Sequence, residues 1–175
     1  MKHAFFQSVS FSGSRHSLPA VSLNCAQLVC SSFSSAVSAA SGSFSVGCCP
    51  SGLDSFVRAF CLPRSFPLRV FSVSGNRSPL ALRSRTLQMV NSASCLFSFP
   101  KSASFAHSGT WLATFAAFQR GIPVFVFLPG AKLESLPCVR GVSSWRKVSA
   151  ASLPVAVPGV SFFWVPCGVS QSELF

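Results

Sequence analysis

The strongest constraint on the fold is a regular alternation of short apolar runs with segments whose apolar residues have helical spacing. The apolar runs predict five strands, at Phe5–Phe11, Ser43–Val46, Leu68–Val73, Cys95–Phe99 and Pro123–Leu128. Between them, the spacing predicts helices over Leu18–Ser31, Leu53–Cys61, Leu80–Ala93 and Trp111–Gln119. Strands that alternate with helices form parallel sheets with right-handed crossovers. The sequence therefore predicts an α/β fold: a single doubly wound, Rossmann-like parallel sheet with about five core strands and helices on both faces.

The alternation weakens after Gly130, and a chain of 175 residues is one domain by length. Residues 1–135 are predicted to form the Rossmann-like domain, and residues 136–175 a C-terminal extension. In that extension, Trp145–Lys147 and Ser161–Val165 are expected to supply either an added edge strand of the same domain or a segment that covers the edge of the sheet. The Ser- and Ala-rich stretch 31–42 is expected to be the turn that leads into the second strand.

Short loops and helix starts near the strand ends are rich in small residues and arginines. The candidate ligand-binding residues in them are Ser12, Gly13, Ser14, Arg15, Gly47, Cys48, Gly52, Asp54, Arg83, Arg85, Ser108, Gly109 and Thr110. Glycines let backbone N–H groups approach a phosphate, while helix N-termini and guanidinium groups neutralise it. These loops therefore predict a site for a nucleotide-like ligand, at which Gly13, Gly47 and Gly109 converge. No catalytic residue and no metal ligand is predicted.

Several of these residues have two interpretations. Arg15 either pairs with a phosphate or is a solvated loop arginine. Asp54 either accepts a hydrogen bond from a ribose hydroxyl or base, or complements the dipole of its helix. Arg85 lies in the first turns of a helix, where a positive charge is unfavourable unless an anion is bound. Thr110 either helps to cradle a phosphate or caps its helix. Cys48 and Cys49 are interpreted as small residues, with a redox role as the alternative.

The composition limits which binding partners and which cellular compartment are expected for the chain. A net charge of +11 favours polyanions, including nucleic acid, although compositional drift would produce the same charge. The 8 cysteines form no CxxC pair and have no histidines at ligand-like spacing, so a reduced, cytoplasmic chain without a zinc site is expected. No export signal is recognised, and the longest apolar run, Ile122–Leu128, is too short to span a bilayer, so no membrane association is expected.

The order of the motifs between residues 5 and 130 resembles the SLOG superfamily, which includes the DNA-processing protein DprA, the YspA-like proteins and the Lonely Guy phosphoribohydrolases. Val46–Asp54 is similar to the glycine-rich loop after the second strand of these proteins, and Arg85–Met89 is similar to the Arg-Asn-x-x-Met of YspA-like proteins. Arg83-Ser84-Arg85 resembles the Arg-Asn-Arg of DprA. Ser108-Gly109-Thr110 is similar to the phosphate-binding turn, and Pro129-Gly130 follows the fifth predicted strand as in DprA.

The resemblance implies that residues 1–135 form a SLOG-like nucleotide-binding domain. The phosphoribohydrolase branch carries a catalytic glutamate just after its phosphate turn, whereas Trp111–Phe115 offers no carboxylate here. The leading hypothesis is therefore a binding or sensor domain for a nucleotide or nucleotide-derived phosphate ligand, without evident catalysis. One alternative is a DprA-like single-stranded nucleic-acid-binding protein, and another is a nucleotide N-glycosidic hydrolase. A homodimer stays an open alternative, and no cofactor beyond the nucleotide-like ligand is expected.

Overall fold

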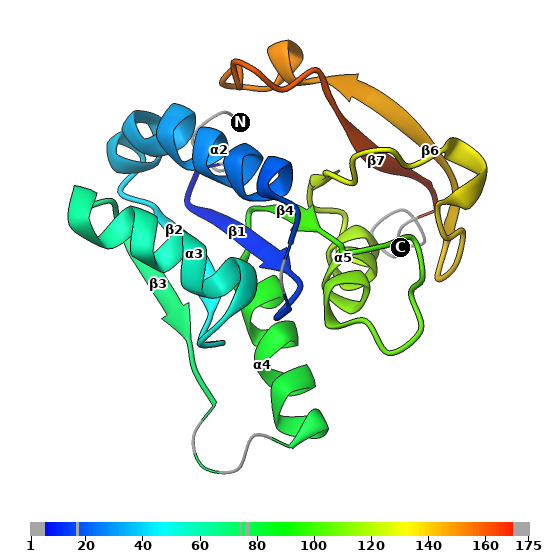
Figure 1. The fold of residues 1–175 in the computed structure, drawn as a ribbon, viewed down its shortest axis with the longest axis horizontal. Coiled ribbons are helices and arrows are strands. Elements are labelled where there is room, and N and C mark those ends of the chain that lie inside the picture. Colours follow the sequence, from blue (N-terminus) through cyan, green and yellow to red (C-terminus); the bar gives the residue numbers. More distant parts are fainter. Residues whose placement is uncertain (1–5, 17, 74, 76–77, 170–175) are drawn as a thin grey trace.

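A single mixed sheet runs through the molecule, seen in a computed structural model that describes residues 6–16, 18–73, 75 and 78–169 (Figure 1). The strands are β1 (Ser8–Gly13), β2 (Ser43–Gly47), β3 (Leu68–Phe71), β4 (Cys95–Phe99), β5 (Val124–Val126), β6 (Val142–Ser149) and β7 (Phe162–Gly168). Their order across the 7-stranded sheet is β3-β2-β1-β4-β5-β7-β6. The first five strands are parallel, and β7 pairs antiparallel with both β5 and β6.

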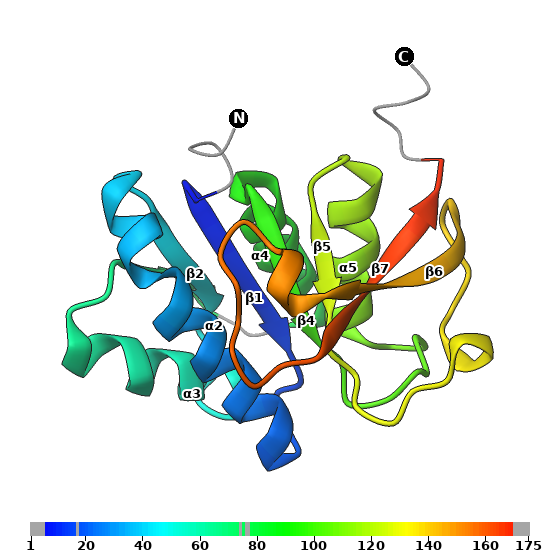
Figure 2. The ribbon, with the colours of Figure 1, turned by 90° about the horizontal axis from the view of Figure 1, so that it is seen from above.

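Helices connect the parallel strands and cover both faces of the sheet. They are α2 (Ala20–Ala39), α3 (Gly52–Cys61), α4 (Pro79–Ser92) and α5 (Gly109–Gln119), with single 3-10 turns at Leu62–Arg64, Leu133–Ser135 and Ala150–Ser152. Figures 1 and 2 show α2 and α3 on one face and α4 and α5 on the other. The predicted α/β class with alternating strands and helices is confirmed, and two antiparallel strands extend the predicted sheet.

The strands nearest the centre of the sheet separate two apolar clusters. On the face covered by α2 and α3, the ring of Phe97 lies 5.5 Å from that of Phe33 and 5.1 Å from that of Phe125, measured between centroids. On the opposite face, Trp111 stacks on Phe115 at 5.6 Å. Both clusters are buried from solvent. The ends of the central strands are therefore held in place by packing on both faces of the sheet.

Small hydroxyl side chains line the face of the central strands that α4 and α5 cover. In β1, Ser8, Ser10 and Ser12 alternate with apolar residues, and all three serines are buried. In β4, the Oγ of Ser98 lies 2.7 Å from the Oγ1 of Thr114 on α5. Because these side chains are short, α5 packs close to the sheet and carries its first turn toward the ends of β1 and β4.

The longest helix, α2, continues beyond its predicted end. Phe33 and Val37 follow Val29 at intervals of four residues and are fully buried, so the stretch expected to be a turn is helical. Length and composition alone would let α2 cross a membrane, and core helices of globular folds meet the same criteria. In this structure, the buried face of α2 packs on the sheet.

The last described residues belong to the same sheet as the first. β7 joins β5 through the pair Val126 and Trp164, and β6 then forms the outer edge. Between β6 and β7, the segment that contains Leu153 and Val157 packs into the cluster beneath α2. In Figure 2, this segment lies over the sheet beside α2, where no helix of the parallel unit reaches.

Candidate functional site

A cavity of about 410 Å³ opens where β1, β2 and β4 end, and we call it the main cavity. The chain proceeds from β1 outward to β2 and β3, and then returns to the other side of β1 to form β4 and β5. The main cavity therefore lies at the point where the strand order reverses, which is where ligands bind in open α/β sheets. Gly13, Gly47 and Gly109 all line it, so the predicted convergence of the three loops is present.

Most of the predicted site residues lie around the main cavity. Those that line it are Ser12, Gly13, Ser14, Arg15, Gly47, Asp54, Arg85, Ser108, Gly109 and Thr110. Cys48, Gly52 and Arg83 do not line it. Arg83 is exposed, and Cys48 contacts Arg85 from outside the main cavity, with its Sγ 3.8 Å from Nη1. The loop after β5 contributes none of the described lining residues.

Three of the four candidate glycines are required by close contacts with neighbouring protein atoms. A Cβ at Gly13 would lie 2.5 Å from the side chain of Leu53, and a Cβ at Gly47 would lie 2.5 Å from the guanidinium of Arg85. At Gly52, φ is +70°, and a Cβ would collide with the carbonyl oxygen of Ser14. Gly52 therefore lets the start of α3 pack closely against the loop after β1. The close contact at Gly52 is with protein backbone. A Cβ at Gly109 would meet nothing within 4 Å.

The first turn of α5 presents free N–H groups to the main cavity. Ser108 is the N-cap, and its Oγ accepts a hydrogen bond from the N–H of Trp111 at 3.3 Å. The N–H groups of Gly109 and Thr110 precede the first donors of the helical ladder and line the main cavity. A helix N-terminus with unpaired donors and no acidic residue in its first turn attracts an anion.

Trp111 holds the loop between β4 and α5 in place. Its indole N–H donates to the carbonyl oxygen of Ser102 at 2.9 Å, and its ring is buried between Phe115 and Trp145. The ring is therefore not available to stack on a base. It fixes the loop that carries Lys101 and His107 along the wall of the main cavity.

Asp54 and Arg85 form a buried pair beneath the main cavity. Asp54 Oδ2 lies 3.6 Å from Arg85 Nη1 and accepts a hydrogen bond from the N–H of Cys49 at 3.2 Å. Burial alone lowers the pKa of Arg85, but the hydrogen bond to Cys49 and the charge of Asp54 outweigh it and raise the pKa above its usual value. The guanidinium is therefore charged, and Asp54 is the acid that holds it.

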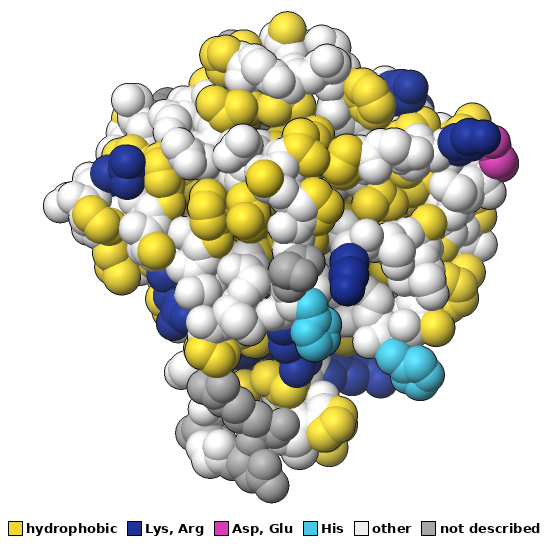
Figure 3. Space-filling model, viewed as in Figure 1, with side chains coloured by type: hydrophobic (Ala, Val, Ile, Leu, Met, Phe, Trp, Pro, Cys, Tyr) yellow, Lys and Arg dark blue, Asp and Glu magenta, His cyan; other side chains and the backbone are white. Residues whose placement is uncertain are grey.

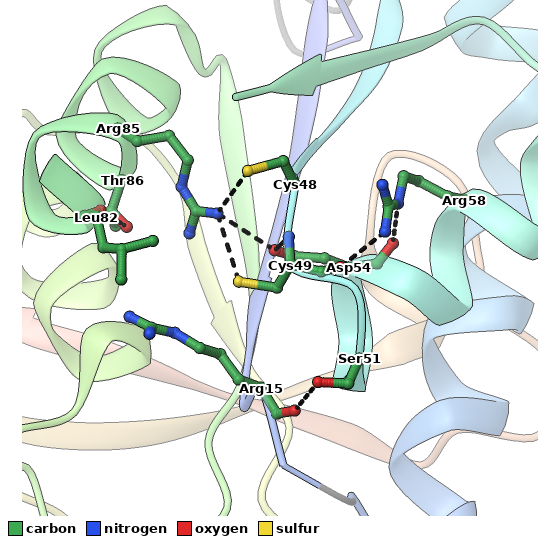
Figure 4. A network of polar contacts seen from close by, with 9 residues as sticks. All are labelled: Arg15, Cys48, Cys49, Ser51, Asp54, Arg58, Leu82, Arg85 and Thr86. Carbon is green, nitrogen blue, oxygen red and sulfur yellow. Dashed lines mark hydrogen bonds and ion pairs between the residues drawn. The ribbon is translucent and has the colours of Figure 1, made fainter. Parts of the chain in front are cut away.

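The partners of Arg85 are weak for a buried cation. Its contact with Asp54 is longer than a hydrogen bond, and Nη1 reaches the Sγ of Cys49 at 3.5 Å (Figure 4). Thiol sulfur is a poor acceptor. The Nε of Arg85 is buried and has no hydrogen-bond partner among the described residues. A charged guanidinium that borders a cavity with so few good acceptors favours a bound anion.

Further basic side chains surround the opening. Arg15, His16, Lys101 and His107 are exposed and line the main cavity, and Asp54 is the only acid among its described lining residues. Figure 3 shows both visible histidines and several basic side chains on the lower part of this face, while other basic side chains lie toward its upper edges. Lys101 is not predicted from the sequence, although it lies two residues after the end of β4. His16 and His107 have no sequence signal beyond their proximity to the loops, whereas the sequence predicts Cys49 only as a small residue of the loop after β2.

The arrangement is suited to holding an anion. Asp54 is the one carboxylate at the main cavity among the described residues, and its charge is engaged by Arg85. No group of three or more His, Cys, Asp or Glu side chains in the described part of the chain could hold a metal ion.

No family model matches the chain, and no curated protein matches it in sequence. The geometry of the main cavity is therefore the basis on which a function is assigned.

Proposed function

We propose that the main cavity binds a nucleotide or nucleotide-derived ligand through its phosphate, and that the chain acts as a SLOG-type binding or sensor domain. One observation supports this most strongly: the buried, charged Arg85 and the free N–H groups at the start of α5 border the same cavity. A helix N-terminus binds phosphate in Rossmann-like folds, and a guanidinium pairs with phosphate oxygens; here both groups lie at the sheet's switch point.

Arg15 completes the proposed phosphate site from the side of β1. Its carbonyl oxygen accepts a hydrogen bond from the Ser51 hydroxyl at 2.7 Å, and this bond fixes the backbone. The guanidinium has no ion pair with any described residue. An anion that lies against Arg85 is within the cavity that Arg15 also lines, so both guanidinium groups are proposed to bind it.

Two matched arginine variants test the proposal. Arg15→Ala removes an exposed guanidinium at the main cavity, whereas Arg83→Ala removes an exposed guanidinium outside it. Calorimetry with a panel of nucleoside 5′-monophosphates should show a loss of about 1.5–3 kcal/mol in binding free energy for Arg15→Ala. Arg83→Ala should bind like the unmodified chain. Equal losses would mean that overall charge drives binding, and the absence of binding to any mononucleotide would refute the proposal.

A second candidate function is single-stranded nucleic-acid binding, which the net charge of +11 favours. Proteins that bind single strands usually combine such a charge with aromatic side chains on which successive bases stack. Here Trp111 is buried, and most described phenylalanines lie in the two core clusters. We therefore propose mononucleotide binding as the main function, and we expect nucleic-acid binding to be weak and sensitive to salt.

A further inference from the structure

A second, smaller cavity adjoins the main cavity. It has a volume of about 140 Å³ and is lined by Arg15, Cys48, Cys49, Pro50, Ser51 and Leu82; we call it the side cavity. Arg15 and Cys49 line both cavities, so they form the boundary between the two. Figure 4 shows the side chains of Arg15 and Arg85 reaching from separate elements toward the region beside Leu82 and the two thiols.

The two cavities differ in chemistry. The main cavity is bordered by basic side chains and by the first turn of α5. In the side cavity, Arg15 is the only charged residue among those that line it, and Leu82, Pro50 and two thiols supply most of the remaining wall. An apolar recess of this kind favours a neutral group, and it lies directly beside a site suited to an anion.

The boundary between the cavities has a fixed backbone and an exposed side chain. The Ser51 hydroxyl donates a hydrogen bond to the carbonyl oxygen of Arg15, and the N–H of Leu53 donates one to the carbonyl oxygen of Ser14 at 3.2 Å. The Arg15 side chain is exposed, so it can change rotamer without disturbing these bonds. A planar guanidinium at such a boundary can bind a phosphate on one side and lie over a flat ring on the other.

We propose that the side cavity receives the nucleobase of the ligand whose phosphate lies in the main cavity, with the Arg15 guanidinium against the ring. This inference rests on the proposed function, because it requires the phosphate to be bound beside Arg85. It assigns Leu82 and Cys48, neither of which lines the main cavity, to base recognition. The ligand class is then a nucleotide with an intact base, and a sugar phosphate alone is a poor substitute.

Thiol footprinting tests the assignment, since Cys48 lies in the wall of the side cavity and is partly exposed. Alkylation by N-ethylmaleimide is followed by mass spectrometry, with the exposed Cys138 as an internal control. The tightest-binding nucleoside 5′-monophosphate should slow alkylation of Cys48 by about tenfold or more and leave Cys138 unchanged. Ribose 5-phosphate, which has no base, should bind about tenfold more weakly and should not protect Cys48 even at saturation.

A filling variant provides a second readout if Cys48 reacts slowly. Leu82→Trp should weaken mononucleotide binding by about tenfold and leave ribose 5-phosphate binding unchanged, whereas Leu82→Met, which keeps the volume, should affect neither. Circular dichroism confirms that each variant is folded. Mononucleotide binding without protection of Cys48, or equal affinity for ribose 5-phosphate, would overturn the inference and leave the proposed function intact. If no phosphate-bearing probe binds, both fail.

Discussion

Asp54 on α3 and Arg85 on α4 meet 3.6 Å apart across the end of β2, although their helices lie on opposite faces of the sheet. Gly47, the last residue of β2, leaves the space in which they meet, because a Cβ there would lie 2.5 Å from the guanidinium. The pair therefore ties the two helical layers together at the sheet edge that borders the main cavity. Its removal should affect stability as well as binding.

Removing the carboxylate should destabilise the fold. In Asp54→Ala, the buried Arg85 keeps only thiol contacts, and the N–H of Cys49 loses its acceptor. We expect the free energy of unfolding in urea to fall by about 3 kcal/mol, the scale for one partner lost from a buried ion pair. Glu134→Gln, which alters an exposed acid, should change it by less than about 0.5 kcal/mol. Similar effects of the two variants would show that the Asp54–Arg85 pair does not stabilise the fold.

Two glycine-to-alanine variants should separate packing from binding. Gly13→Ala places a methyl group against Leu53 and should lower the free energy of unfolding by about 1–3 kcal/mol. Gly109→Ala meets no protein atom within 4 Å, so its stability should change by less than about 0.5 kcal/mol. Because the new methyl group lies beside the N–H groups proposed to hold phosphate, mononucleotide affinity should fall about tenfold. Thermal unfolding and calorimetry measure the two effects, and unchanged affinity in Gly109→Ala would argue against a phosphate at α5.

Salt dependence should distinguish the two candidate functions. A mononucleotide makes few ionic contacts, so its affinity should fall by less than about tenfold between about 50 and 200 mM salt. A single strand that contacts about six phosphates should have a log–log slope near about −4, with a loss of a few hundredfold over the same range. Titrations of both ligands at several salt concentrations provide the comparison. Tight single-strand binding that survives high salt, with no mononucleotide binding, would reverse the proposed order.

Buried thiols should resist modification in the native state. Burial raises the pKa of Cys25 and Cys95 well above the usual value, so neither thiol forms a reactive thiolate near pH 8. A disulfide reagent should label the exposed Cys138 quickly, and should label Cys25 and Cys95 only after urea is added. Quantitative peptide mapping makes the comparison, and rapid native labelling of Cys95 would contradict its position in the core.

The sequence predicts the parallel unit well because its signals are local. The strand Cys95–Phe99 has the predicted bounds, and α5 ends at Gln119, the predicted last residue of that helix. Two features depend on tertiary contacts instead. The second half of α2 is helical because Phe33 and Val37 pack on the sheet. β6 was only partly recognised, since a register shift between Val142 and Ser144 interrupts the alternation that marks a strand.

The site is predictable as a set of loops but not as a set of contacts. Arg83 and Arg85 lie two positions apart on one helix and therefore point in different directions, and the sequence does not say which one faces the cavity. The role of Asp54 as the partner of Arg85 joins residues from two helices, and no local pattern encodes that pairing. Lys101 lies at the main cavity because the order of the strands brings the end of β4 beside the end of β1.

The position of β7 between β5 and β6 has a consequence for folding during synthesis. The outermost strand, β6, is synthesised before β7, which is the last of the described strands and the one that joins β6 to the parallel sheet. Until residues 162–168 leave the ribosome, the edge of β5 is unpaired, and such an edge recruits strands from other chains. A nascent chain stalled with residues 162–168 inside the exit tunnel should therefore be far more prone to aggregate than one in which a C-terminal linker has carried these residues out of the tunnel.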